Sequence, residues 1–517
     1  MKKDYTVLFV SPEMMIPELP EPACGANFRG GLGILSGDIM EGLARREVGA
    51  VAITPFYNSH WMTHEGIIYD RTPAQTLFEI VVNDKPVKVR EIWRGGTRVL
   101  GLESDVFNVL YVADRWQRIL QEVLLGHAVP AVLKKLDIKP DICWLNEGHT
   151  AITIPVMKED RYFAGIKFLF TTHTPVPEGM EKFYGDDHWF NALRINREKY
   201  HSVFVKDGMI DMTRAVMILA ETVNAVSQEH CEVTKRMFPE FSHKIVYITN
   251  GSSRELWMSS FLKELGEEFG IARFLEAQQA TKEEFIKFLE QKTNIRFDIQ
   301  KPILVWVRRI AWYKQQYPML ASIIRAICAE KGQAIETEFG RLEGLGFQVF
   351  GAGRAHESDA QCLGWMTEFQ KWMSKPGLAG NFVFLPEYNL ELLKRTAQGC
   401  DVWFSCPLPQ WEACGTSDRR ATINGKVNLT TRAGGAKEYI KDYNPITGEG
   451  NGFFIEPYEP RTVYNKLKII SDLYYAWMAK RDRRWSKLMK VSFEAGKALD
   501  VVPMIEKYEQ IFENLLN

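Results

Sequence analysis

The chain has 517 residues, of which 46% are hydrophobic and 12% aromatic, so it is long enough to form more than one core and we expect two domains. Its 64 basic and 65 acidic residues give a net charge of −1, which excludes a general electrostatic attraction to nucleic acid or to an anionic membrane. Any anion that the protein binds must therefore be captured locally.

Short apolar runs alternate with amphipathic segments through the first half of the chain. We expect strands at 5–11, 49–56, 140–146, 166–173, 222–227 and 244–250, and helices at 116–136 and 210–221. Segment 87–104 alternates around Gly95 and Gly96, which predicts a hairpin at the edge of the sheet. Buried strands that alternate with helices predict a mainly parallel sheet with right-handed crossovers.

The pattern pauses over 255–297, which is charged, helical and without strands, and it restarts near 300. A second set of strands is expected at 303–309, 347–353, 381–388, 401–406 and 426–431. We therefore expect an N-terminal domain over 1–300, a C-terminal domain over 301–485, and a C-terminal helix over 486–517 that could pack back on the first domain. Two such parallel α/β domains would bind ligands in a cleft, beyond the carboxyl ends of their strands.

The location of the protein is indicated by its cysteines and by its apolar runs. The eight cysteines form no C-x-x-C pair, which favours reduced thiols over disulfides or a zinc site. The first apolar run is too short for a signal peptide, and no run approaches the roughly 18 residues of a membrane span. We expect a cytoplasmic protein with no membrane partner, and a homo-oligomer is compatible with the sequence.

Several polar or glycine residues follow the strands of the first domain. Gly31 and Gly33 lie in a glycine-rich turn that could bring the backbone close to a phosphate or sugar, although such turns are often only turns. His149, with Glu147 beside it, and His173 each come directly after a strand. Either histidine could be structural, but two at strand ends favour contacts to a polar ligand such as a sugar. No cysteine and no H-E-x-x-H spacing accompanies them, so we expect no metal site.

The amide of Asn250, which precedes Gly251, could bind a substrate hydroxyl or simply form part of a turn.

The second domain contains the stronger signals. Arg309 and Lys314 lie in "VRRIAWYK", at the first turn from a strand to a helix, and a guanidinium with an ammonium there suits a phosphate leaving group. Glu412 precedes the turn "ACGTS", which leads into a helix. The backbone N–H groups and hydroxyls of Gly415, Thr416 and Ser417 could cradle an anion at that helix start.

Taken in order, these motifs resemble those of the α-glucan phosphorylases, especially their short prokaryotic form, and of the related bacterial glycogen and starch synthases. The resemblance extends from about residue 5 to about residue 455 and rests on "GANFRGGLGILSGD", "WLNEGHTAITIP", "FTTHTPVPEG", "ITNG", "VRRIAWYK", "VFLPEYN" and "DVWFSCPLPQWEACGTS". It implies a GT-B fold, in which two Rossmann-like domains face each other across a cleft, and retaining glucosyl transfer without a protein nucleophile.

The resemblance also implies roles for individual residues. Arg309, Lys314, Glu412 and His173 would form the catalytic set, with the first two clamping phosphate, Glu412 holding sugar hydroxyls and His173 contacting the glucosyl unit. Substrate would be bound by Gly31, Gly33, Glu147, His149, Asn250, Cys414, Gly415, Thr416, Ser417 and Arg420. Glu147 departs from the aspartate that long phosphorylases have at this position.

Position 420 departs most from the phosphorylases, in which "GTSGMK" or "GTGNMK" ends in the lysine that forms a Schiff base with pyridoxal phosphate. Here the string is "GTSDRR". A guanidinium stays protonated and is a poor imine-forming nucleophile, so Arg420 cannot anchor the cofactor. We therefore expect no cofactor, with a non-covalently held pyridoxal phosphate as the alternative.

The segments after this string, "TTRAGGAKEYI" and "GEGNGFFIEPYEP", and the "E-x-C-G" that includes Cys414, resemble the synthases.

Three functions follow from these observations. The first is transfer of glucose from ADP- or UDP-glucose to an α-1,4-glucan or maltooligosaccharide acceptor, with Arg420 supplementing neutralisation of the diphosphate or ordering the loop. The second is a glucan phosphorylase that uses phosphate or glucose 1-phosphate. The third is an inactive glucan-binding paralogue, which the retention of the catalytic set argues against.

Overall fold

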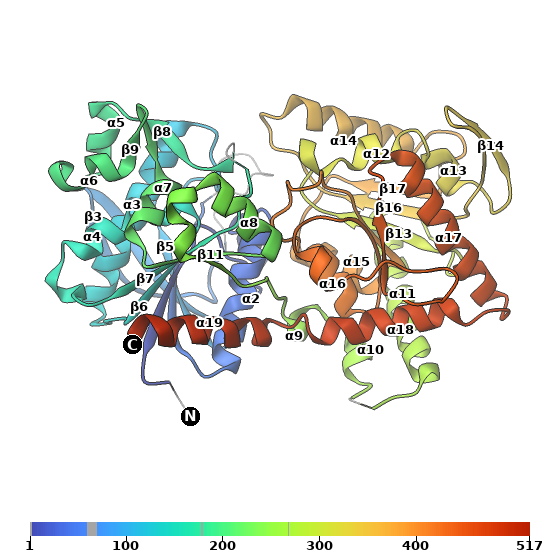
Figure 1. Cartoon of the computed structure of the whole chain (residues 1–517), viewed down its shortest axis with the longest axis horizontal. Coiled ribbons are helices and arrows are strands. Elements are labelled where there is room, and N and C mark those ends of the chain that lie inside the picture. Colours follow the sequence, from blue (N-terminus) through green and yellow to red (C-terminus); the bar gives the residue numbers. More distant parts are fainter. Residues whose placement is uncertain (1–2, 59–69, 177–178, 267) are drawn as a thin grey trace. The chain divides into compact units, whose positions relative to one another are not determined.

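The computed structural model describes residues 3–58, 70–176, 179–266 and 268–517 (Figure 1). The chain forms two compact units: unit 1 contains residues 1–253 and 501–517, and unit 2 contains residues 254–500. Each unit is built around a parallel sheet with helices on it. Among the described residues, no helix combines the length and apolar character needed to cross a membrane.

Unit 1 is organised by a nine-stranded sheet in the order β12-β11-β7-β6-β1-β2-β5-β4-β3. The parallel strands are short and, apart from β12 at the edge of the sheet, mostly buried, as expected from their apolar runs. They are β1 (Thr6–Val10), β2 (Gly49–Phe56), β5 (Thr97–Glu103), β6 (Ile142–Asn146), β7 (Lys167–Thr172), β11 (Thr222–Ala225) and β12 (Ile245–Tyr247). Because β1 lies between β2 and β6, the strand order reverses at β1, and ligands of open α/β sheets bind at such a point.

The predicted hairpin over 87–104 is confirmed as β4 (Lys85–Arg94) and β5, which are antiparallel to each other. It does not form the edge of the sheet, however. Strand β5 also pairs with β2 in parallel, and β3 (Gln75–Val82), which we did not predict, adds outside β4. A separate small sheet contains β8 (Lys182–Tyr184), β10 (Met209–Asp211) and β9 (Val205–Lys206).

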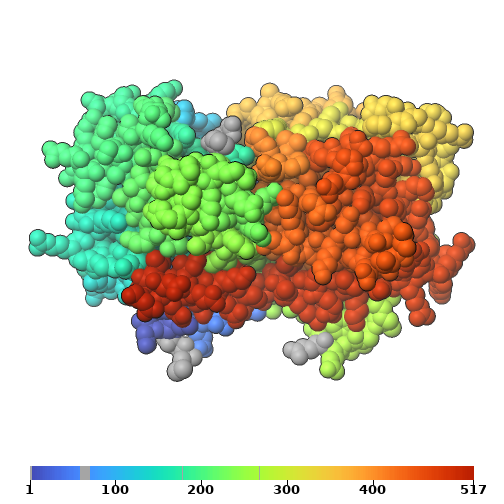
Figure 2. All heavy atoms as spheres, viewed as in Figure 1, coloured from blue at the N-terminus to red at the C-terminus, as the bar shows by residue number. Residues whose placement is uncertain are grey.

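The helices of unit 1 are α1 (Ala23–Ala26), α2 (Gly31–Arg45), α3 (Arg115–Lys135), α4 (Thr153–Lys158), α5 (Asp187–Ala192), α6 (Arg197–Phe204), α7 (Met212–Leu219), α8 (Gln228–Met237) and α19 (Val501–Leu516). Helix α19 joins this unit from the far end of the sequence. The ring of Tyr508 packs 4.1 Å from that of Trp144, and its hydroxyl accepts a hydrogen bond from Asn224. Figure 2 shows N-terminal residues (blue) beside α19 (dark red), where Lys3 pairs with Glu513 at 3.2 Å.

Unit 2 contains a six-stranded parallel sheet in the order β17-β16-β13-β18-β19-β20. Its strands are β13 (Ile303–Val307), β16 (Gln348–Ala352), β17 (Phe382–Leu385), β18 (Val402–Ser405), β19 (Val427–Thr431) and β20 (Gly452–Ile455), of which all but β20 were predicted. The hairpin of β14 (Ala334–Thr337) and β15 (Gly340–Glu343) lies outside this sheet. When the six strands of the sheet are numbered along the chain, their order is the 3-2-1-4-5-6 of a Rossmann sheet. The switch point lies between β13 and β18.

The helices of unit 2 are α9 (Arg254–Trp257), α10 (Ser260–Lys263), α11 (Ile271–Thr293), α12 (Gln316–Leu320), α13 (Ile324–Cys328), α14 (Ala360–Trp372), α15 (Leu390–Gly399), α16 (Ser417–Ile423), α17 (Pro460–Met478) and α18 (Arg484–Lys497). Residues 254–300, which we expected in the first domain, therefore belong to unit 2. Contacts of helix α11 explain this grouping. Gln278 donates a hydrogen bond to the carbonyl of Asn424. Phe285 packs so closely on Gly399 that a Cβ added to Gly399 would lie 2.2 Å from the Cβ of Phe285.

The C-terminal segment also differs from the expectation of one helix over 486–517. It forms two helices, α18 in unit 2 and α19 in unit 1, which are separated around Leu499 and Asp500. Gly496 near the end of α18 lies against the backbone of Thr422 and Ile423 in α16, and this contact holds α18 to unit 2.

Candidate active-site residues in the two units

In unit 1 the predicted residues lie beyond the carboxyl ends of β1, β6 and β7, except for Asn250, which follows β12. The side chains that link these strand ends form one hydrogen-bonded chain. Nε2 of His173, after β7, lies 2.6 Å from Oδ1 of Asn146, at the end of β6. Nδ2 of Asn146 donates to Ser11 after β1 and to Ser36 in α2, at 3.3 and 3.1 Å. These hydrogen bonds thus position His173 relative to the glycine turn at the start of α2.

The same hydrogen bonds determine which ring nitrogen of His173 carries a proton. Because Nδ2 of Asn146 donates to the two serines, its Oδ1 is an acceptor, and Nε2 of His173 must carry the proton. Burial, and then the nearby His230, lower the pKa of His173 to about 3, so the imidazole is neutral at ordinary pH. Among the described residues its Nδ1 has no hydrogen-bond donor. His173 therefore offers a lone pair that could accept a bond from a hydroxyl.

Glu147 holds the loop that carries His173. Its backbone has a φ of 66°, which turns the chain sharply at the end of β6. One carboxylate oxygen accepts from the backbone N–H of His173 at 2.6 Å and from the hydroxyl of Thr174 at 2.9 Å, and the other faces the N–H of Gly148 at 3.3 Å. Burial raises the pKa of Glu147, and these donors partly offset that rise. Both oxygens are thus engaged within the protein, which favours a positioning role over the substrate contact that we predicted.

The glycine turn contains one exposed and one buried glycine. Gly31 is exposed at the first position of α2, where its backbone can be approached. Gly33 is buried, and a Cβ on it would lie 2.5 Å from Cβ of Phe28 and 2.9 Å from the carboxylate of Glu13. Glu13 is itself buried and accepts from the N–H of Arg29 and the hydroxyl of Tyr111, at 2.7 and 2.8 Å. Packing therefore accounts for Gly33, and a ligand contact by Gly31 stays a prediction.

The two remaining residues predicted in unit 1 have different surroundings. Nε2 of His149 lies 3.2 Å from the carboxylate of Glu181, and its ring packs edge-on against Tyr111. Asn250 is 3% exposed, and in the part of the chain that the structure describes its Oδ1 makes no hydrogen bond. A buried amide oxygen that accepts no hydrogen bond destabilises the folded protein. This favours the predicted contact of Asn250 with a ligand hydroxyl.

In unit 2 the central group is a cluster around Glu412, in the loop after β18. One of its oxygens, Oε2, accepts from Nη2 of Arg308 at 3.1 Å and from Nζ of Lys314. Burial alone would raise the pKa of Glu412, but Lys314, Arg308 and Arg309 outweigh it, so the pKa is lowered and the group stays ionised. Oε1 makes no hydrogen bond within the described residues. The structure thus joins two predicted residues and adds Arg308, which we had not predicted.

Arg309 follows Arg308 but is exposed at the end of β13. Its positive charge also acts on Tyr313, whose burial would raise its pKa but whose neighbours Lys314 and Arg309 lower it. Three cationic side chains therefore surround one carboxylate. This is an excess of positive charge at the switch point of the unit 2 sheet.

The turn before α16 offers further donors. Within the described residues, the backbone N–H groups of Gly415, Thr416 and Ser417 have no acceptor, as the predicted cradle requires. Cys414 is buried, and its sulfur lies 3.5 Å from Nη2 of Arg419.

Arg420 does not lie in this cradle but packs inward from α16. Its guanidinium stacks 4.5 Å over the ring of Trp257, its Nε donates to the carbonyl of Thr416 at 3.1 Å, and its side chain is buried. The residues at this position do not fit covalently bound pyridoxal phosphate, because a guanidinium cannot form the imine and the side chain is covered by an aromatic ring. Arg420 orders the start of α16.

Comparisons with known proteins connect the chain to two kinds of enzyme. A family model described as the starch synthase catalytic domain matches residues 6–245, which is less than half of the chain. A maltodextrin phosphorylase from Thermococcus litoralis is 26% identical over 86% of this chain and 63% of its own length. A glycogen synthase from Clostridium acetobutylicum is 24% identical over 74% of each chain. The chain thus spans less than two thirds of that phosphorylase.

A solved structure provides the comparison for the fold. The catalytic domain of starch synthase IV from Arabidopsis thaliana, bound to ADP and acarbose, superposes with a TM-score of 0.77 over 99% of this chain and 100% of its own, at 16% sequence identity. The predicted GT-B fold is confirmed by this similarity.

Proposed function

Because the chain is related to the α-glucan phosphorylases and to the glycogen and starch synthases, two groups of glycosyltransferases, we propose that it is a retaining α-glucosyltransferase that acts on α-1,4-glucan. The donor is ADP- or UDP-glucose, and the acceptor is the non-reducing end of a glucan or maltooligosaccharide.

The cationic cluster of unit 2 is the observation that carries this proposal. Arg308 and Lys314 contact the carboxylate of Glu412 at the end of β13, and the charge of Arg309 also acts on it. A diphosphate leaving group gains negative charge as its bond to the sugar breaks, and cations that are already in place stabilise that charge without reorganisation. The free N–H groups at 415–417 supply further donors. The ADP bound to the Arabidopsis starch synthase supports the same class of donor.

The unit 1 residues suit a sugar rather than a phosphate. Neutral His173 presents an acceptor nitrogen, and Asn250 presents an amide oxygen that has no partner among the described residues. The buried carboxylate of Glu13 beside Gly33 disfavours an anion. Hydroxyl groups are donors and pair with such acceptors. The acarbose bound to the Arabidopsis enzyme is a compatible ligand class.

In this reaction the acceptor hydroxyl attacks the anomeric carbon on the face from which the diphosphate departs, so the configuration is retained. The bond from the anomeric carbon to phosphate breaks, the bond to the acceptor oxygen forms, and the acceptor proton passes to the leaving phosphate. Lys314 and the two arginines hold the leaving phosphate. Oε1 of Glu412, which accepts no hydrogen bond from the described residues, is placed to accept one from a sugar hydroxyl. The protein therefore acts by positioning and by stabilising charge.

A glucan phosphorylase is the second candidate, and the 86% of the chain that aligns with the maltodextrin phosphorylase favours it. Position 420 weighs against it. The amine of the cofactor-binding lysine is replaced by a guanidinium that is buried against Trp257.

The experiment incubates purified protein with maltoheptaose and, separately, ADP-glucose, UDP-glucose, glucose 1-phosphate or inorganic phosphate, and identifies the products by chromatography. Extended maltooligosaccharides with a nucleotide-glucose are expected. Glucose 1-phosphate formed from maltoheptaose and phosphate, together with the near-ultraviolet absorbance of bound pyridoxal phosphate, would refute the proposal in favour of a phosphorylase. Glucan binding without turnover of any donor would indicate an inactive paralogue.

A further inference from the structure

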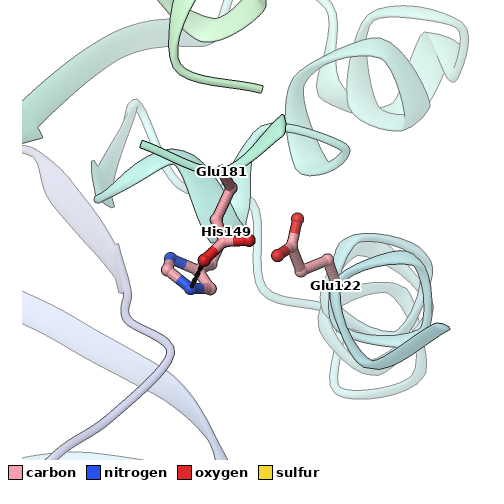
Figure 3. A group of neighbouring side chains, drawn as sticks. All are labelled: Glu122, His149 and Glu181. Carbon is pink, nitrogen blue, oxygen red and sulfur yellow. Dashed lines mark ion pairs between the residues drawn. The ribbon is translucent and has the colours of Figure 1, made fainter. Parts of the chain in front are cut away.

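A buried cluster in unit 1 lies outside the residues that the proposed reaction uses. Glu122 comes from α3, His149 from the short turn Gly148–Thr150 after β6, and Glu181 from the segment just before β8 (Figure 3). One ligand atom of each residue lies within 4.8 Å of those of the other two. We propose that these three side chains bind one divalent transition-metal ion of the zinc class.

The chemistry and spacing of the three groups suit such an ion. One imidazole nitrogen and two carboxylate oxygens form a mixed N/O ligand set, which zinc and its neighbours accept and which magnesium and calcium, with their preference for oxygen alone, do not. Ligands of a tetrahedral zinc ion at about 2.0–2.2 Å lie roughly 3.3–3.6 Å from one another. Nε2 of His149 and the oxygen of Glu181 are already 3.2 Å apart, so only Glu122 must move closer.

The surroundings of the Glu122 carboxylate are independent evidence for a bound cation. Its side chain is 3% exposed, and among the described residues neither carboxylate oxygen has a hydrogen-bond donor. Figure 3 shows this carboxylate pointing toward Glu181 and His149. Arg118 pairs with Glu181 at 3.0 Å and, among the described residues, donates no hydrogen bond to Glu122. A buried carboxylate that accepts no hydrogen bond is disfavoured, and a bound cation would compensate it.

Room for a fourth ligand exists beside the cluster. A small cavity lined by Tyr111, Gln121, Glu122 and His149 holds roughly one water molecule. Three protein ligands with one water is the arrangement of zinc sites that keep an open position. His149 would coordinate as a neutral imidazole.

The ion would join three segments that are far apart in the sequence. His149 is two residues from Glu147, whose carboxylate holds the backbone of His173. Fixing the turn that carries His149 would therefore stiffen the support of the sugar-binding histidine. The role is structural, and the ion takes no part in the proposed transfer.

The test uses the full-length chain, stripped of metal with a chelator and dialysed, to which Zn²⁺ is added. Metal content after desalting, affinity by calorimetry and the melting temperature are measured. We expect one zinc per chain and a melting temperature raised by several degrees, with no such effect from Mg²⁺. Glu122→Gln and His149→Gln should each weaken zinc binding at least about 100-fold and abolish the temperature shift.

Glu198→Gln, which changes an exposed carboxylate on α6, is the matched control and should bind zinc as the wild type does. If Glu122→Gln does not fold, the visible absorption of Co²⁺ added to the wild type, and its loss in His149→Gln, report on the same site. Absence of zinc from the wild type would show that a proton compensates Glu122 and would overturn the inference. Equal zinc content in all variants would overturn it as well, by placing the metal on other groups. None of these readouts depends on glucosyl transfer, so this inference and the proposed function fail independently.

Discussion

Replacing Lys314 by methionine tests the role of the cationic cluster most directly. The change keeps the length of the side chain and removes its charge. Three cations and one carboxylate, a formal charge of 3 − 1 = +2, would become two cations and one carboxylate, a charge of +1. Loss of one donor to a developing negative charge costs about 2.7–4 kcal/mol of transition-state stabilisation, so we expect kcat to fall roughly 10²- to 10³-fold.

Folding should be much less sensitive to this change. Glu412 keeps its ion pair with Arg308 at 3.1 Å, and the repulsion between Arg308 and Lys314 disappears. We therefore expect a smaller loss of stability than the about 3 kcal/mol that leaving a buried charge without any partner costs. The KM for glucan should stay near that of the wild type, because Lys314 is assigned to the phosphate of the donor and not to the glucan acceptor.

Initial rates with the donor that the wild type uses, measured over a range of maltoheptaose concentrations, give kcat and KM. Urea denaturation gives the stability. Lys375→Met, at an exposed position on the same unit, is the control and should leave all three quantities unchanged. A fall in kcat of less than tenfold, or a large rise in the KM for glucan at constant kcat, would refute the assignment of Lys314 to the leaving group.

Three further outcomes are expected. Glu412→Gln leaves two buried cations without a counter-ion and should destabilise unit 2 by about 3 kcal/mol, and unchanged urea denaturation would contradict this. Gly33→Ala places a methyl group 2.5 Å from Cβ of Phe28, so it should lower the free energy of unfolding, measured in the same way, by about 1–3 kcal/mol. An unchanged free energy of unfolding would contradict the tight packing around Gly33. Burial lowers the pKa of His173 to about 3 and that of His230 to about 4, below the roughly 6.5 of the unfolded chain. The unfolded chain therefore binds more protons in this range. Stability should be fully present above pH 6.5 and fall by up to about 1.4 kcal/mol per pH unit for each histidine as the pH drops toward 4. His230→Gln should reduce that slope, whereas an unaltered slope would disprove its contribution.

Most of the parallel strands were predictable because each is a short apolar run that ends at a turn or a polar residue. Strand β3 was missed because its residues are half exposed on an antiparallel edge, where the apolar signal is diluted. The division near residue 300 was displaced for a related reason. Helix α11 carries many charges and precedes the second set of strands, but its buried Phe285 fits against Gly399, and such a long-range contact has no local signature.

The site was predictable as a set of strand ends but not as a set of contacts. Neighbouring residues of an extended chain point to opposite sides, so the sequence cannot tell which of Arg308 and Arg309 faces Glu412. The loop-holding role of Glu147 depends on where its two oxygens point. Glu122, on α3, gave no signal at all, because the groups near it come from other segments.

The return of the last helix to the first unit has a consequence for how the protein can be divided. The chain passes from one unit to the other twice, after residue 253 and after residue 500. A fragment that stops at residue 253 would lose the rings of Tyr508 and Phe512 that pack on Trp144, and a deletion within 501–517 would perturb unit 1. Because Lys3 and Glu513 are in contact, a short linker could join these two positions, and a self-standing first unit would need residues 501–517 attached to it.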